Sequence, residues 1–358
     1  MESTEILYLP LDIDVETKAV LRKTASAHQA LAELKGVMSS LPNEQILIQT
    51  LALREARESS AIENIISTFD EIYRSNYQNQ QFASAAAKEV HHYAKALIEG
   101  FGLVKTHGLL TTNTILHIQE VVEQNKAGFR KLPGTKLLND LTGEIIYTPP
   151  QDYASIVSLM KNLESFINDD SMMDLDPLIK MAIIHYQFES IHPFYDGNGR
   201  TGRIINILYL VQKGLLGLPI LYLSGFIITH KNDYYRLLQQ IRLTGDWEEW
   251  LLFMLEGIEK TAKEGIRLIQ ALRSLMQEQK NQIRYTLPKM YSQDLLNSLF
   301  KYPYTKIEYI QEDLQVSRNT AIRYLEGLVK EEIVVKHKLG RENYYENKKL
   351  FNLLSGRL

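Results

Sequence analysis

Residues 192–203 read HPFYDGNGRTGR, and this stretch decides how the rest of the chain is interpreted. Its twelve positions hold three glycines, two arginines, an asparagine, an aspartate and a histidine. It matches neither the phosphate-binding pattern G-x-x-x-x-G-K-[ST] nor G-x-G-x-x-G after a strand. The glycines indicate a backbone that approaches a ligand closely, and the arginines indicate that this ligand is an anion.

Both flanks of this stretch are predicted to be helical. Asp176 followed by Pro177 is a typical helix start, and Pro193 ends that helix just after His192. The following segment, TGRIINILYLVQKG, predicts a nearly apolar helix that begins around Arg200 and ends near Gly214. The glycines therefore precede a helix N-terminus, where free N–H groups and a positive partial charge favour phosphate.

The side chains in the loop suit phosphate chemistry. Gly197, Asn198 and Gly199 can form an anion-binding nest, with the asparagine adding an amide donor. One carboxylate beside phosphates, here Asp196, is a common way to bind Mg²⁺. A histidine with a pKa near neutrality is a natural general base. A glycine-rich turn between helices is often only a solvated loop, but here eight positions fit one mechanism.

The stretch resembles the signature of Fic (Fido) domain proteins, H-P-F-x-[D/E]-G-N-G-R-x-x-R, at every specified position. The preceding AIIHYQFES also resembles the helix that leads into this signature. The resemblance implies transfer of AMP from ATP to a protein hydroxyl, with release of pyrophosphate. It makes His192 the base, Asp196 the Mg²⁺ ligand, the nest an α-phosphate site, and the two arginines contacts of the β- and γ-phosphates. The implied ATP-binding residues of the loop are Asp196, Gly197, Asn198, Gly199, Arg200, Thr201, Gly202 and Arg203.

Two neighbouring segments extend the resemblance. Residues 135–138 and 144–148 predict a β-hairpin, which the family uses as a flap that pairs with the target's backbone. Without the motif, it would be read as an ordinary surface hairpin. The resemblance implies a flap strand and an adenine pocket formed by these residues: Lys136, Leu137, Leu138 and Asn139 for the strand, and Tyr234, Tyr235 and Arg242 for the pocket. Packing is the alternative role for the two tyrosines, and His185 is predicted to be a hydrogen-bonded structural histidine.

A second motif lies in a helix predicted over residues 43–76. The segment RESSAIENI resembles the Fic inhibitory motif [S/T]-x-x-x-E-[G/N], with Ser59, Glu63 and Asn64 at its specified positions. The resemblance implies that Glu63 pairs with Arg203 and misplaces the phosphates of ATP. An ordinary amphipathic helix with a solvated Glu63 is the alternative interpretation.

Composition and periodicity predict a soluble, mainly helical chain. Its 358 residues are 45% hydrophobic and 23% charged, with a net charge of −3. The absence of cysteine excludes disulfides, thiolate zinc sites and a cysteine nucleophile. The N-terminus lacks the features of a signal peptide and no apolar run is long enough to span a membrane, so we expect a cytoplasmic protein.

We expect an all-α Fic domain with a small β-hairpin flap, followed by a C-terminal winged helix-turn-helix domain. The predicted divisions are an N-terminal helical region with the inhibitory helix, a Fic core, a linker helix and the winged helix, at residues 1–90, 91–262, 263–285 and 286–358. The last of these could contact DNA or another protein. The candidate DNA contacts are Arg318, Asn319, Arg323, Lys336, Lys338 and Arg341.

The sequence thus predicts a Mg²⁺- and ATP-dependent protein adenylyltransferase that modifies a Tyr, Thr or Ser hydroxyl of a target protein, and also itself. The chain could also form a homo-oligomer, and we expect it not to bind membranes. Two alternatives stay open: transfer of a different phosphate-containing group on the same scaffold, and a DNA-binding regulator that senses ATP without turning it over.

Overall fold

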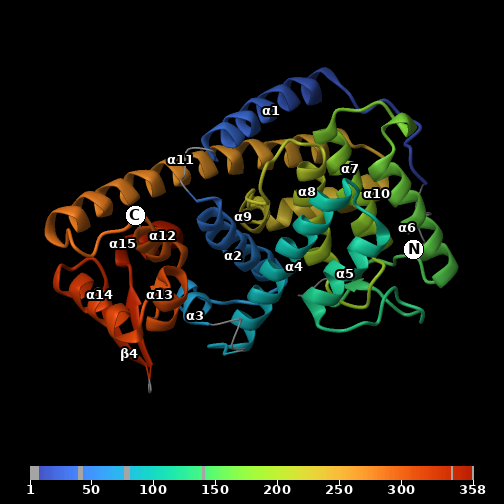
Figure 1. The fold of residues 1–358 in the computed structure, drawn as a ribbon. Coiled ribbons are helices and arrows are strands. Elements are labelled where there is room, and N and C mark those ends of the chain that lie inside the picture. Colours follow the sequence, from blue (N-terminus) through green and yellow to red (C-terminus); the bar gives the residue numbers. More distant parts are fainter. Residues whose placement is uncertain (1–7, 39–42, 76–80, 139–141, 340–341, 357–358) are drawn as a thin grey trace.

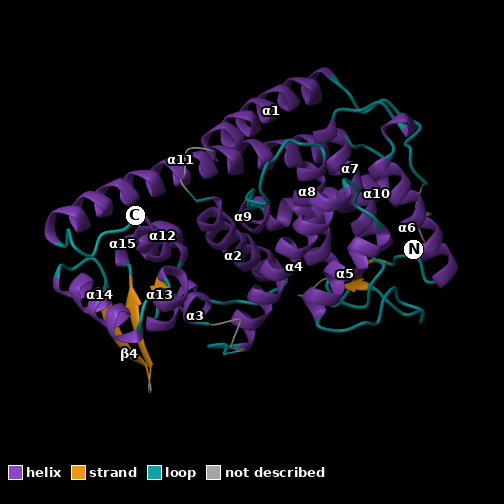
Figure 2. Cartoon of the chain, in the orientation of Figure 1, coloured by secondary structure: helices purple, strands orange, loops and turns teal. Residues whose placement is uncertain are grey.

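The computed structural model describes residues 8–38, 43–75, 81–138, 142–339 and 342–356. This part of the chain is mostly helical, and its strands are confined to one hairpin and a small C-terminal sheet (Figures 1 and 2). The N-terminal and central elements are α1 (Lys18–Met38), α2 (Glu44–Ile62), α3 (Phe69–Arg74), α4 (Ala85–His107), α5 (Thr112–Glu123), β1 (Leu137–Leu138), β2 (Ile145–Tyr147), α6 (Tyr153–Asn168), η1 (Asp170–Met172), α7 (Pro177–Ile191), α8 (Asn198–Gln212), α9 (Leu223–Thr229) and α10 (Lys231–Thr244). The remaining elements are α11 (Glu248–Thr286), α12 (Gln293–Lys301), β3 (Tyr304–Thr305), α13 (Ile307–Leu314), α14 (Arg318–Lys330), β4 (Val335–Leu339), β5 (Glu342–Glu346) and α15 (Lys348–Ser355).

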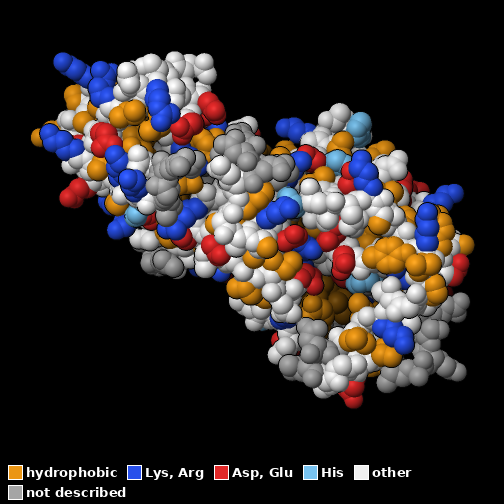
Figure 3. All heavy atoms as spheres, turned by 90° about the horizontal axis from the view of Figure 1, so that it is seen from below, with side chains coloured by type: hydrophobic (Ala, Val, Ile, Leu, Met, Phe, Trp, Pro, Cys, Tyr) orange, Lys and Arg blue, Asp and Glu red, His pale blue; other side chains and the backbone are white. Residues whose placement is uncertain are grey.

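The 39-residue helix α11 connects the two halves of the molecule. Helix α1 packs along it beside the central helices, and the C-terminal elements gather at its other end (Figure 1). Its buried positions recur with helical spacing over its whole length, from Trp250 to Ile283. The face in Figure 3 shows the resulting elongated shape, with acidic and basic side chains interspersed over it. Among the described residues, no helix is long and apolar enough to cross a membrane.

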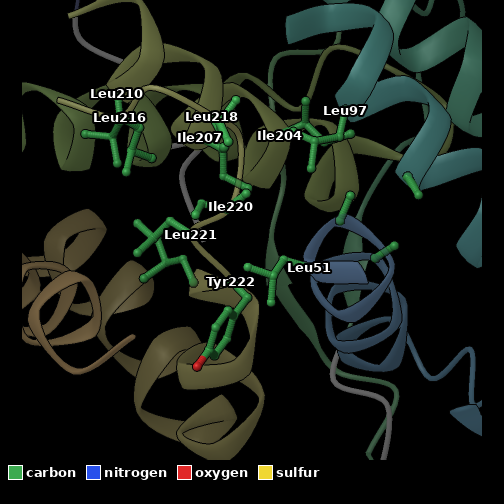
Figure 4. Packing of buried hydrophobic residues seen from close by; sticks show 14 of the residues in the cluster. Leu51, Leu97, Ile204, Ile207, Leu210, Leu216, Leu218, Ile220, Leu221 and Tyr222 are labelled. Carbon is green, nitrogen blue, oxygen red and sulfur yellow. The ribbon is translucent and has the colours of Figure 1, made fainter. Parts of the chain in front are cut away.

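Helices α7 and α8 form the centre of the larger half. The residues of α8 from Thr201 to Leu210 are all buried, including the polar residues Thr201, Arg203 and Asn206. Helices α4, α5 and α7 pack against it. Figure 4 shows a neighbouring part of this core, where Leu51 of α2 lies close to the segment that carries Leu221 and Tyr222. The site loop is therefore attached to the most buried pair of helices.

The C-terminal domain has the predicted helix-turn-helix with a wing. Helices α13 and α14 are separated by a short turn, and β4 pairs antiparallel with β5, which also pairs with β3. The domain also contacts α2 and α3: the Tyr304 hydroxyl donates a hydrogen bond of 2.8 Å to Asp70 Oδ1. On the α11 side, the buried amides of Gln279 and Asn347 bond to each other.

Local signals placed several helix ends correctly. Asp176 caps α7, with its side chain accepting from Leu178 N and Pro177 in the first turn, which confirms that prediction. The single helix expected over 43–76 is wrong. The chain forms α2 and α3 with an extended segment between them, because Thr68 and Glu71 form a capping box that starts a new helix. Helix α8 begins at Asn198, two residues before the predicted start, and α11 runs without a break through the predicted range 263–285.

Candidate active site

His192 occupies the residue that ends α7. Its φ of 47° is left-handed, and its N–H still donates to Phe188 O at 2.9 Å, so the chain turns sharply there. Burial, followed by the charge of Arg130, lowers the pKa of His192 to about 4. The imidazole is thus neutral near pH 7 and able to accept a proton.

The glycine loop presents the free N-terminus of α8. Gly197 is the N-cap residue with a φ of 80°, and no side chain caps this end. The Asn198 side chain is used inside the loop, accepting from Phe194 N and donating to Phe194 O at 2.9 Å each. A Cβ on Gly199 would lie 2.3 Å from Glu63 Oε1, so a side chain here would have to displace the Glu63 carboxylate. The uncapped, positively polarised N-terminus fits an anion, and the exposed carboxylate of Asp196 beside it fits a metal-bound phosphate.

Arg203 is buried and bound on two sides by the end of α2. Its Nε donates to Ser59 Oγ at 2.7 Å, and its Nη2 donates to Ser59 O at 3.0 Å and to Glu63 Oε1 at 2.8 Å. Burial works to raise the pKa of Glu63, but the charge and hydrogen bond of Arg203 outweigh it, so this pKa is lowered. The three residues of the second motif thus lie at one helix end, where Glu63 caps α2 and Asn64 has a φ of 62°.

Arg200 also has carboxylate partners. Its Nη1 lies 2.8 Å from Glu89 Oε2 on α4, and its Nη2 lies 2.6 Å from Glu123 Oε1 at the end of α5. A Cβ on Gly197 would meet the same Glu123 oxygen at 2.4 Å. Burial raises the pKa of Glu123, against the opposing charge of Arg200. Sequence reasoning missed both acids, because they lie on separate helices and match no motif.

Two positions near the start of α8, Thr201 and Gly202, face inward. Thr201 is buried, and its Oγ1 has no hydrogen-bond partner among the described residues. A Cβ on Gly202 would lie 2.7 Å from Glu189 Oε1 and 3.0 Å from a ring carbon of Phe188. Gly202 thus permits the close approach of α8 to α7, and the prediction that both positions contact ATP is not tested by these contacts.

Two further carboxyl groups are buried near Arg203. Glu55 accepts from Ser224 N at 3.1 Å and from the Tyr93 hydroxyl at 3.0 Å, whereas Glu189 Oε1 has no partner among the described residues. Burial raises the pKa of each to about 7. Sequence reasoning missed them as well. For Glu189 a signal existed, because a residue three positions before His192 on the same helix projects to the same side.

The hairpin lies beside the loop, as predicted. Leu137 pairs with Tyr147 and Leu138 with Ile145, with a register shift between them, so the strands are shorter than expected. The described flap residues Lys136, Leu137 and Leu138 are at least partly exposed, whereas Asn139 lies outside the described residues. The hairpin therefore offers an accessible strand next to the loop.

The residues expected around adenine lie at different depths. Tyr234 is buried, and its hydroxyl forms a 2.8 Å hydrogen bond with His185 Nε2, which confirms the structural assignment of that histidine. Tyr235 is exposed on the next position of α10. The Arg242 guanidinium stacks over the ring of Tyr147 in the flap at 3.8 Å. Binding of adenine by these residues stays a prediction.

The predicted DNA contacts are exposed on the C-terminal domain. Arg318, Asn319 and Arg323 lie on the surface of α14, and Lys336 and Lys338 lie on β4. Arg318 pairs with Glu308 at 3.0 Å and Lys336 pairs with Glu326, so two of these cations already have acidic partners. Arg341 lies outside the described residues.

A cavity of about 390 Å³ lies apart from the glycine loop, between α2, α3, α4 and the C-terminal domain. It is lined mostly by apolar and aromatic side chains, among them Leu53, Ile72 and Tyr302. No residue of the 192–203 loop lines it.

A helical domain whose glycine-rich loop joins two central helices beside a hairpin has the Fic fold. Three family models match the chain: Fic/DOC family N-terminal over residues 21–102, Fic/DOC family over 109–210, and the C-terminal domain of SoFic-like protein adenylyltransferases over 275–350. The chain therefore belongs to the Fic/DOC family, with its N-terminal region and a SoFic-like C-terminal domain.

Its curated relatives are distant and match in part. Protein adenylyltransferase fic-1 of Caenorhabditis elegans is 37% identical over 111 residues, and protein adenylyltransferase Fic of Drosophila yakuba is 30% identical over 112 residues. Each match covers 31% of this chain and about a fifth of the relative, 20% and 21% respectively.

Solved structures agree in fold. A Fic family protein from Desulfovibrio desulfuricans G20 aligns over 95% of this chain and 98% of its own, with a TM-score of 0.60 and 19% identity. Fic-1 from C. elegans aligns over 70% of this chain and 73% of its own, with a TM-score of 0.54 and 20% identity.

Proposed function

We propose that this protein is a protein adenylyltransferase that moves AMP from ATP to a hydroxyl side chain of a target protein and of itself. The observation that carries the proposal is the complete loop between α7 and α8. It combines a neutral histidine, an uncapped helix N-terminus, a carboxylate and two arginines in one turn. The names of the distant relatives support the same activity.

The reaction follows from these positions. The target's hydroxyl oxygen attacks the α-phosphorus of ATP, and its proton passes to the imidazole of His192. The bond from the α-phosphorus to the bridging oxygen breaks, and pyrophosphate leaves. The N–H groups at the start of α8 stabilise the charge on the α-phosphate. A Mg²⁺ ion on Asp196 would neutralise charge on the phosphates.

We propose further that the end of α2 inhibits the enzyme. Arg203 is the arginine that reaches the γ-phosphate in this scheme, and its guanidinium is already bonded to Glu63 and Ser59. Gly199 adds a second obstacle, because the Glu63 carboxylate lies directly over it. ATP that binds beside Glu63 is held with its phosphates displaced, and a displacement of about 1 Å can slow transfer roughly 100-fold.

The test is incubation of the full chain with α-labelled ATP and Mg²⁺. Wild type, Glu63→Gly, His192→Ala and the double variant are compared. We expect weak self-labelling of wild type, at least tenfold more for Glu63→Gly, and none for either variant that lacks His192. Mass spectrometry of the product separates AMP from phosphate or another nucleotide.

The two parts of the proposal fail separately. If Glu63→Gly acquires no label and consumes no ATP, the transferase function is refuted. Equal labelling of wild type and Glu63→Gly would leave the transferase in place and remove the inhibitory role of Glu63.

A further inference from the structure

Four consecutive backbone carbonyls at the end of α7 receive hydrogen bonds from the segment that leads into and out of the flap. The Tyr147 hydroxyl donates to Ser190 O at 2.8 Å, and Arg130 supplies the other donors. Its Nη2 approaches Ile191 O at 3.5 Å, its Nε donates to His192 O at 2.8 Å, and its backbone N–H donates to Pro193 O at 2.9 Å.

These carbonyls need partners for a general reason. The last carbonyls of a helix receive no hydrogen bond from N–H groups of the same helix, and a buried carbonyl left without a donor destabilises the fold. A glycine at the following position often solves this by turning the chain, but here the turn is made by His192 itself, with a φ of 47°. The left-handed conformation of His192 must therefore be stabilised by hydrogen bonds from residues outside α7.

Arg130 also binds the far end of the hairpin. Its Nη2 donates to Pro150 O, three residues after β2 ends. One guanidinium thus joins the exit of the flap to the backbone of His192.

The charge of Arg130 has an unusual environment. The side chain is only 1% exposed, and no carboxylate among the described residues forms an ion pair with it. Its compensation comes from the carbonyl end of α7, which carries a negative partial charge. Burial lowers the pKa of Arg130, but an arginine stays protonated in any protein environment. A permanent cation therefore lies next to His192.

We propose that Arg130 is the positioning residue of the active site. It holds His192 in its left-handed conformation and couples the flap to the base. This inference rests on the proposed function for its kinetic consequences, whereas its structural part concerns the free protein alone.

Other charges also act on the imidazole. Arg242, which stacks on Tyr147, lowers the pKa of His192 as Arg130 does, and the Glu63 carboxylate raises it. The backbone carbonyl of Glu189 also raises it. Burial is the largest influence, so removal of Arg130 shifts the pKa of His192 upward without returning it fully to its ordinary value.

The experiment compares Arg130→Gln, Arg130→Lys and Lys131→Gln in the full-length Glu63→Gly protein. Lysine keeps the charge but lacks the planar guanidinium whose Nε and Nη2 bond to His192 O and Pro150 O at once. Lys131→Gln removes a neighbouring exposed charge and is the matched control. Two readouts are taken: the ring pKa of His192 from NMR of histidine-labelled protein, assigned with His192→Ala, and the pH profile of kcat and KM for ATP.

We expect Arg130→Gln to raise the ring pKa of His192 and to lower kcat about 10- to 100-fold, with KM for ATP unchanged. Arg130→Lys is expected to keep the low ring pKa but still lose kcat, and Lys131→Gln to match its parent in both. The acid limb of the profile should move to higher pH in Arg130→Gln alone.

An unshifted ring pKa in Arg130→Gln together with an unchanged kcat would overturn the inference. Equal losses in all three variants would also overturn it, because they would indicate a general effect on folding. If Arg130→Gln does not fold, Arg130→Lys decides: an unchanged kcat there overturns the positioning role. If the Glu63→Gly protein shows no transfer, the proposed function fails, and the NMR titration still tests whether Arg130 controls His192.

Discussion

Replacing Glu63 by glutamine should destabilise the free protein and increase the stabilisation that ATP provides. The substitution keeps the shape of the side chain but removes the negative charge 2.8 Å from Arg203 Nη2. Breaking a fully buried ion pair by removing one partner costs about 3–5 kcal/mol. The Glu63 side chain is 36% exposed and Arg203 keeps its bonds to Ser59, so we expect about 1–3 kcal/mol.

The second half of the prediction concerns ATP. Once Glu63 no longer competes, the γ-phosphate can bind Arg203 directly. If affinity for ATP rises tenfold, saturating ATP stabilises Glu63→Gln by about 1.4 kcal/mol more than the parent. The His192→Ala background prevents transfer during the measurement.

The assay is thermal unfolding with and without Mg²⁺-ATP. At about 2 °C per kcal/mol for a chain of this size, the midpoint of Glu63→Gln should fall by roughly 2–6 °C without ATP, and ATP should raise it by roughly 3 °C more than in the parent. The measurement belongs near pH 7.5. The pKa of Glu63 is lowered in the folded state, so its pairing is present above the unfolded-state pKa and is lost as pH falls through the folded-state value.

Glu58→Gln is the matched control, because Glu58 lies on the same helix and pairs with Arg57. The reasoning is refuted if Glu63→Gln lowers the midpoint no more than Glu58→Gln does and gains no extra stabilisation from ATP.

Three further outcomes are expected. Burial raises the pKa of Glu55 to about 7, so the folded state binds more protons than the unfolded state between about pH 4.5 and 7. Glu55→Gln should therefore stabilise the protein at pH 8, by at most on the order of 3 kcal/mol, and change its stability little at pH 4.5. Denaturant unfolding at the two pH values checks this. Gly100→Ala should destabilise by about 1 kcal/mol in the same assay, since its Cβ would lie 2.7 Å from Leu208 Cδ1 between α4 and α8, and an unchanged midpoint would contradict the packing argument. Because Arg318 is already paired with an acid, we expect the full chain to bind duplex DNA weakly. Fluorescence anisotropy at about 50 and 200 mM salt measures this binding and its salt dependence. Tight binding that is lost in Arg323→Ala would instead support DNA contact.

The sequence predicted the parts of the site that are local in the chain. The order of histidine, carboxylate, glycines and arginines in 192–203 needs no tertiary information, because one turn between two helices carries them all. Helix starts with strong caps, such as Asp176 with Pro177, were predicted for the same reason. The C-terminal end of α2 was not predicted, because the apolar periodicity continues past Ile62 and the capping box at Thr68 was not recognised.

The parts that escaped are those made by pairing across the fold. Glu89 and Glu123 meet Arg200 from two different helices. Arg130 lies in a segment of turn formers without periodicity, and only the folded chain places it against the end of α7. A buried ion pair or a charge on a helix end is set by tertiary packing, for which a single sequence offers no local pattern.

Helix α11 has a consequence for how a target could be selected. A straight helix of 39 residues is about 58 Å long, and it is braced by α1 near one end and by α12 and α15 near the other. The C-terminal domain is therefore held in place by this helix together with its contacts to α2 and α3. If the proposed function holds and a partner binds that domain, only hydroxyls at one set distance and direction from its docking surface would reach His192. Under the proposed function, the length of α11 would thus add a geometric criterion to the choice of target.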